Sequence, residues 1–104
     1  MSKLEDEFCF QLDLKKIKYE REVSVIPGRR YRWDVALLPL SRKILVEVNG
    51  GIWIKGGHST GGGIERDAEK LNLATIAGYK TLIVTAKHIK SGRALRWVEE
   101  ILGA

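Results

Sequence analysis

Residues 31–49 read YRWDVALLPLSRKILVEVN and hold two apolar, β-rich segments separated by the loop 39–42. Two such segments joined by a tight connection predict an antiparallel hairpin. When the strands are paired so that Leu38 faces Lys43, one face of the hairpin carries only apolar pairs. These pairs are Trp33 with Val48, Val35 with Val46, and Leu37 with Ile44. A shift of one residue would set Trp33 against a polar side chain, which favours this register.

The other face of the hairpin is polar at its open end. There Arg32 lies opposite Asn49, and Asp34 lies opposite Glu47. Cβ atoms at opposed antiparallel positions are roughly 4.5–5.5 Å apart, so two carboxylates placed there repel each other. A divalent ion such as Mg²⁺, which prefers oxygen ligands, would relieve that repulsion. The alternative is a solvated pair screened by Arg32 or Lys43, and the pairing alone does not decide between the two.

Segments on both sides of the hairpin predict a mixed α/β chain. Helical spacing predicts a helix over 4–14, with Ser2 as its N-cap and Glu7 turned toward the core. β-Branched residues predict strands over 22–26 and 79–85. Further helices are predicted over 64–77 and 92–102. The inner stripe of the helix 64–77 is expected to be Ile64, Ala68, Leu71 and Thr75. The expected fold class is α/β (α+β) in three layers, with a central mixed sheet of four to five strands between helices.

Composition limits the classes of protein to be considered. The 104 residues suit one domain over 1–104, and 44% of them are hydrophobic and 30% charged. The net charge of +5 and the pI near 9.5 favour anionic partners such as DNA. Cys9 is the single cysteine, which excludes an internal disulfide. Residues 1–7 lack a secretory pattern and no apolar stretch reaches the ~20 residues that span a bilayer, so we expect a cytoplasmic protein with no membrane partner.

Several motifs follow one another along nearly the whole chain. They are RRYRWD at 29–34, VEVNGGIW at 46–53, Gly57-His58 with Gly61, Asp67 with Glu69-Lys70 and Asn72, and AGYK at 77–80. Together with an acidic residue in the first helix, this set resembles the PD-(D/E)XK nuclease superfamily. The resemblance is strongest to the small phage and bacterial branch related to VRR-NUC and very-short-patch-repair nucleases. It implies a restriction-endonuclease-like fold and metal-dependent hydrolysis of DNA phosphodiester bonds.

The resemblance also implies roles for individual residues. Asp34 and Glu47 would hold Mg²⁺ or Mn²⁺, and Glu7 would hold the ion directly or through a water. The backbone carbonyl of Val48 would complete the shell. The ion would lower the pKa of the attacking water and stabilise the charge on the phosphate.

Position 49 departs from the superfamily pattern, because Asn49 stands where a lysine usually follows the glutamate by two residues. Asn49 can hydrogen-bond a water or a phosphate but carries no charge. Lys70 is the candidate substitute, and the alternative is a solvated lysine paired with Asp67. His58, in a glycine-rich loop, is a candidate for phosphate contact, proton transfer or metal binding, and the alternative is an ordinary surface residue.

Cationic residues near the acids are candidates for binding the flanking phosphates of DNA. The expected DNA-binding set consists of Arg29, Arg30 and Arg32 at the open end of the hairpin, Lys55, Lys87, and Gly57, whose backbone can approach a ligand closely. We therefore expect a metal-dependent DNA endonuclease. The sequence does not decide whether cleavage is structure-selective or nicking, or whether the protein forms a homodimer. The rivals are a Holliday-junction resolvase and, from another class, a non-catalytic DNA-binding domain that has kept the fold and lost the activity.

Overall fold

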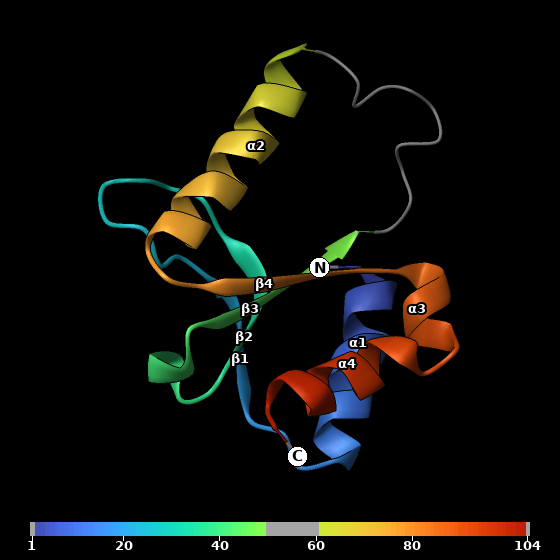
Figure 1. Ribbon diagram of the computed structural model, residues 1–104. Coiled ribbons are helices and arrows are strands. Elements are labelled where there is room, and N and C mark those ends of the chain that lie inside the picture. Colours follow the sequence, from blue (N-terminus) through green and yellow to red (C-terminus); the bar gives the residue numbers. More distant parts are fainter. Residues whose placement is uncertain (1, 50–60, 104) are drawn as a thin grey trace.

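The computed structural model describes residues 2–49 and 61–103. The chain contains both helices and strands (Figure 1). The elements are α1 (Lys3–Leu14), β1 (Tyr19–Val23), β2 (Trp33–Leu37), the 3₁₀ helix η1 (Leu40–Arg42), β3 (Ile44–Asn49), α2 (Gly61–Ile76), β4 (Lys80–Thr85), α3 (Ala86–Lys90) and α4 (Arg93–Ile101). None of the helices in these ranges is both long and apolar enough to cross a membrane.

The strands form one mixed sheet in the order β1-β2-β3-β4. β2 is antiparallel to both of its neighbours, whereas β3 and β4 are parallel. The predicted register of the hairpin is confirmed where the ladder is regular, because Val35 pairs with Val46 and Ala36 with Leu45. As a result, the start of β2 and the carboxyl ends of β3 and β4 meet at one edge of the sheet.

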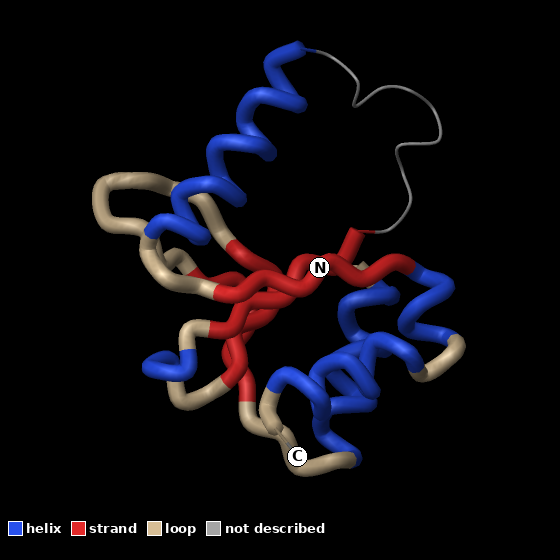
Figure 2. Tube along the Cα trace, viewed as in Figure 1, coloured by secondary structure: helices blue, strands red, loops and turns tan. Residues whose placement is uncertain are grey.

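Helices cover both faces of the sheet, as predicted (Figure 2). Helices α1, α3 and α4 lie on one face, where Phe8, Ile89 and Val98 are fully buried in a cluster with the β-strand residues Val35 and Val46. Helix α2 lies on the other face (Figure 1). The core therefore has two parts, one on each side of the sheet.

The orientation of α2 differs from the prediction. Ile64 and Leu71, which were expected to face inward, are 55% and 39% exposed, and Ala68 and Thr75 are exposed as well. The residue that faces the sheet is Ala74, which is fully buried. Figure 1 shows the reason, since only the C-terminal half of α2 lies against the sheet and the N-terminal half extends beyond it. Apolar spacing alone therefore selected the wrong stripe.

Trp33 is buried as predicted, with 1% exposure, but on the opposite face of the sheet. It packs with Ala36, Leu45 and Ala74 on the α2 side, whereas Val35 belongs to the cluster under α1. Regular alternation would place Trp33 and Val35 on the same face. The alternation therefore breaks between these two residues, at Asp34.

The first strand lies earlier in the chain than predicted. It covers Tyr19–Val23 instead of 22–26, and Tyr19 pairs with Leu37. Glu22, within this strand, has a φ of 53°, in the left-handed region that non-glycine residues seldom adopt. The strand is thus irregular at Glu22, which lies beside Asp34 of β2 because the pairs on either side are Arg21 with Val35 and Val23 with Trp33.

Candidate active site

Asp34 and Glu47 meet at the point where the ladder between β2 and β3 ceases to be regular. The backbone N–H of Asp34 donates to Oε1 of Glu47 over 3.1 Å. In return, the backbone N–H of Val48 donates to Oδ2 of Asp34 over 2.7 Å. Each carboxylate therefore accepts a hydrogen bond from the backbone of the opposite strand. The two acids lie at the same level of the sheet, as the register predicted, but they are interlocked through the backbone instead of simply facing each other.

Lys70 of α2 reaches the same place from the face of the sheet that α2 covers. Its ammonium donates to Oε2 of Glu47 and to the backbone carbonyl of Arg32. It also lies 4.9 Å from the centre of the Trp33 ring, in range of a cation–π contact. The Lys70 side chain is only 18% exposed. The alternative of a solvated lysine paired with Asp67 is therefore wrong, and the partner of Lys70 is Glu47.

Burial controls the electrostatics of Glu47. Removal from water raises its pKa above the ordinary value of 4.5. The hydrogen bond and charge of Lys70 lower the pKa, and the negative charge of Asp34 raises it, but the net direction is upward. The ionised Glu47 is therefore under-compensated by its protein partners, and a further cation nearby would stabilise it.

The acid that α1 contributes is Glu5, and the prediction of Glu7 is wrong in placement. Glu5 is 4% exposed, whereas the side chain of Glu7 is 40% exposed and forms an ion pair with Lys90 over 3.1 Å. The buried face of α1 consists of Glu5, Phe8, Cys9 and Leu12. Phe10 and Leu14, although apolar, are 60% and 67% exposed. The inner face of the helix is thus rotated toward Cys9, which brings Glu5 inward and leaves Glu7 outside.

Glu5 is grouped with two other carboxylates. Oxygen atoms of Glu5, Glu22 and Asp34 all lie within 4.8 Å of one another. Glu5 also accepts a hydrogen bond from Nε of Arg21 over 2.9 Å, and another guanidinium nitrogen of Arg21 lies 2.8 Å from Oδ1 of Asp6. Burial raises the pKa of Glu5, the bond from Arg21 lowers it, and the charge of Asp34 raises it again, with a net upward shift.

The three carboxylates Glu5, Glu22 and Asp34 are a suitable donor set for a hard divalent cation, because all of their ligand atoms are oxygens and Glu5 is nearly excluded from water. Neither Glu5 nor Glu22 was predicted. The spacing of Glu5 with Phe8, Cys9 and Leu12 is a signal that could have identified the first. The second depends on a strained backbone conformation, for which the sequence carries no comparable signal.

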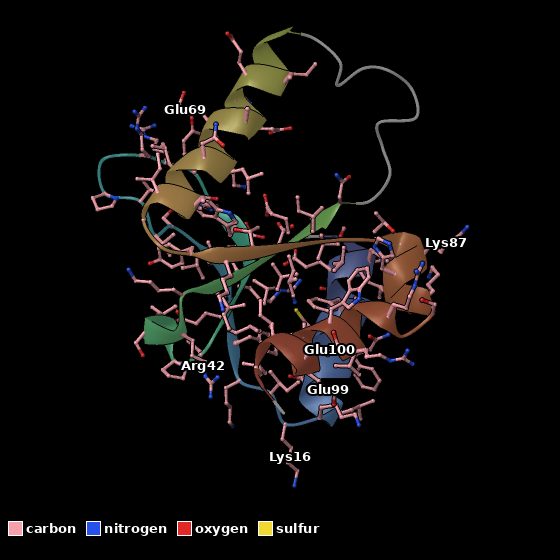
Figure 3. All side chains as sticks on the ribbon, in the orientation of Figure 1. Lys16, Arg42, Glu69, Lys87, Glu99 and Glu100 are labelled. Atoms are coloured by element: carbon pink, nitrogen blue, oxygen red, sulfur yellow. The ribbon has the colours of Figure 1, made fainter. Side chains whose placement is uncertain are left out.

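The remaining predicted site residues lie around this edge of the sheet or outside the described ranges. Asn49 ends β3 opposite Thr85 of β4, and Val48 packs on the core under α1. Lys87 is exposed on α3, just after β4 (Figure 3). Arg30 and Arg32 are exposed before β2, and Arg29 forms an ion pair with Glu69 over 3.0 Å. Lys55, Gly57 and His58 lie outside the described residues.

Comparisons with known proteins bear on the fold. Neither a protein-family model nor a curated protein sequence matches this chain. Among solved structures, the catalytic domain of the homing endonuclease I-Bth0305I matches with a TM-score of 0.72. The match covers 97% of this chain and 94% of that one, with 20% sequence identity. The chain has a homing-endonuclease-like fold. The predicted nuclease-like architecture, a mixed sheet between helices, is therefore confirmed.

Proposed function

We propose that this chain is a divalent-metal-dependent DNA endonuclease of the PD-(D/E)XK type. The observation that carries the proposal is the meeting of Asp34, Glu47 and Lys70, an acid–acid–lysine set, at one edge of a nuclease-like sheet. The catalytic domain that shares the fold is named as that of a homing endonuclease, which supports DNA as the substrate. The net charge of +5 agrees with a polyanionic partner.

Asp34, Glu5 and Glu22 would hold Mg²⁺ or Mn²⁺, with Glu47 and the backbone carbonyl of Val48 beside them. Glu5 takes the place for which Glu7 was predicted. When bound, the ion supplies Lewis acidity, which makes a water a better nucleophile and stabilises charge on the phosphate. The protein's own charges explain why a cation is favoured here, since the pKa values of Glu5 and Glu47 are both raised despite Arg21 and Lys70.

Lys70 supplies the positive charge that Asn49 lacks. It comes from α2 and not from β3, but it reaches Glu47, the acid that a lysine at position 49 would have accompanied. An ammonium at this place can donate to a phosphate oxygen and offset the charge that develops during hydrolysis. Asn49, at the end of β3, would orient a water or a phosphate oxygen. The water oxygen would form the new bond to phosphorus, and the leaving oxygen of the DNA would take up a proton.

Exposed cations around the acidic edge would bind the phosphates on either side of the cut. These residues are Arg29, Arg30, Arg32 and Lys87. Lys55, Gly57 and His58 stay predictions for the segment between β3 and α2. We retain Mg²⁺ and Mn²⁺ as equal candidates, because the oxygen donor set does not distinguish them.

The test is a cleavage assay on supercoiled plasmid and on branched DNA, with Mg²⁺, Mn²⁺ or EDTA. We expect cleavage that requires the metal and is abolished in Asp34→Asn and Glu47→Gln, with DNA affinity retained. Glu100→Gln on α4, far from the site, is the matched control and should cut normally. Metal-dependent cleavage that survives Asp34→Asn would overturn the site. Symmetric paired cuts confined to four-way junctions would support the resolvase. If the protein binds DNA but neither cuts it nor binds Mn²⁺, the non-catalytic domain would be supported.

A further inference from the structure

A groove of about 680 Å³ lies beside the proposed active site and takes no part in the metal site. It is formed between α2 and Tyr31, which precedes β2. Its lining residues include Tyr31, Glu65, Arg66, Glu69, Asn72 and Leu73. Figure 3 shows Glu69 on the outer side of α2, away from the helices that cover the opposite face of the sheet.

The groove is close to the proposed site of cleavage. Tyr31 is three residues before Asp34, a chain distance of at most about 11 Å. Glu69 is the neighbour of Lys70 in α2, and the backbone carbonyl of Arg32 accepts a hydrogen bond from Lys70. A DNA strand whose phosphate lies at Asp34 and Lys70 would therefore bring one of its adjacent nucleotides to this groove.

The charges in the groove indicate which part of that nucleotide it accepts. Glu65 and Glu69 are one helical turn apart, and both line the groove. Glu69 is already bound to Arg29 over 3.0 Å, whereas Glu65 has no hydrogen-bond or ion-pair partner within the ranges 2–49 and 61–103. Carboxylates repel a phosphate but accept N–H groups. Arg66 also lines the groove and can hold the phosphate of the same nucleotide, so the part of the nucleotide that Glu65 accepts is the edge of a base.

The aromatic ring of Tyr31 provides a surface on which a base can stack. Burial and the neighbouring Glu69 raise the pKa of Tyr31, so its hydroxyl stays neutral. The side-chain amide of Asn72 adds a donor and an acceptor to the same groove. A stacking ring, an available carboxylate and an amide are the groups with which proteins recognise an unstacked base by its Watson–Crick edge.

We propose that this groove binds an unpaired guanine in the strand that is cut. The inference rests on the proposed nuclease function and specifies its substrate class as DNA with an unpaired base near the cleaved bond. Guanine is the DNA base whose Watson–Crick edge offers two adjacent N–H donors, which match the two oxygens of the Glu65 carboxylate. The other bases place an acceptor next to each donor on that edge, and this acceptor would be repelled by a carboxylate. A base within a regular duplex cannot present its Watson–Crick edge at all.

Binding can be measured without cleavage, by fluorescence anisotropy in EDTA with labelled duplexes that each carry one bulged base. We expect the 104-residue chain to bind a guanine bulge about tenfold more tightly than a thymine bulge or a fully paired duplex. An inosine bulge, which lacks the 2-amino group of guanine, should fall between guanine and thymine.

Substitutions in the groove test whether the preference for guanine arises there. Tyr31→Leu removes the stacking ring and should reduce the guanine preference to about twofold or less, whereas Tyr31→Phe should retain it. Glu65→Gln should abolish the distinction between guanine and inosine. Glu100→Gln is the control for loss of one surface carboxylate and should leave both preferences unchanged.

The outcomes separate this inference from the proposed function. Equal binding of all bulged bases by the wild type, or an unchanged preference in both Tyr31→Leu and Glu65→Gln, would overturn the guanine groove. If such a protein still cuts DNA in a metal-dependent manner, the nuclease function stands and only the groove is wrong. Absence of both DNA binding and cleavage would overturn the two proposals together.

Discussion

Replacing Lys70 by methionine tests how far one ion pair holds α2 and the acidic edge together. Lys70 and Glu47 are 18% and 26% exposed, so the pair is largely shielded from solvent screening. A hydrogen bond to a charged group contributes about 1.5–3 kcal/mol, and a cation over a tryptophan ring adds about 0.5–2 kcal/mol. Methionine keeps much of the apolar stem and recovers part of this loss. We therefore expect Lys70→Met to lower the free energy of unfolding by about 2–4 kcal/mol at neutral pH.

The loss should depend on pH in a defined direction. The pKa of Glu47 is already raised above its ordinary value of 4.5, mainly by burial, and Lys70 is the group that lowers it. Without Lys70 the pKa rises further, so the ionised carboxylate opposes folding more strongly. A group whose pKa is raised in the folded state loses this penalty as the pH falls through that pKa. The destabilisation should therefore be largest at neutral pH and should shrink as the pH approaches 4.5.

Urea denaturation of wild type, Lys70→Met, Glu47→Gln and the double variant measures these quantities. In the Glu47→Gln background, Lys70→Met should cost less than in the wild type, because the lost charge partner is already neutral. Lys87→Met, at an exposed lysine on α3, is the control and should change stability by less than about 0.5 kcal/mol. If Lys70→Met costs no more than Lys87→Met, or costs the same with and without Glu47, the ion pair does not hold α2 as we describe.

Further predictions concern the acids. On plasmid DNA, Glu5→Gln should lower the cleavage rate by about 10²- to 10³-fold, whereas Glu7→Gln should lower it less than about threefold. Similar effects of the two substitutions would contradict the assignment of Glu5. Because the pKa values of Glu5 and Glu47 are both raised, the free energy of unfolding of the wild type should increase as the pH falls from neutral toward 4.5. Glu47→Gln should make this increase smaller. A decrease in stability over the same pH range would contradict the directions of the shifts. Mn²⁺ should raise the thermal midpoint of the wild type and not that of Asp34→Asn, and equal shifts in differential scanning calorimetry would place the ion elsewhere.

The regular part of the hairpin could be predicted because the core leaves little choice of partners. Only one register places apolar residues opposite one another, and a slip of one residue would expose them all. The structure agrees at Val35 and Val46. The prediction of the face failed at Trp33, because Asp34 replaces a backbone partner with its own carboxylate and the alternation breaks there.

The helices were harder to orient than to locate. In α1, hydrophobicity argues against burying Glu5, yet Arg21 of β1 compensates its charge over 2.9 Å. Such a contact joins segments distant in sequence, so local spacing did not reveal it. In α2, the spacing of Ile64 and Leu71 predicts that they are buried, but the part of the helix that contacts the sheet is centred on Ala74 and Lys70. The position of a helix relative to its sheet decides which of its faces is covered.

Arg21 bears on the order in which the protein assembles. Its guanidinium contacts Glu5 and Asp6 and offsets part of their negative charge without a metal ion, so we expect the chain to fold before any ion binds. Zinc fingers represent the opposite arrangement, in which apoprotein and unfolded protein are the same species. Under the proposed function, folding and metal loading would then be separate events, and the ion could arrive together with the DNA. Protein purified in a chelator should therefore be folded, and it should cut DNA once a salt of the metal is added.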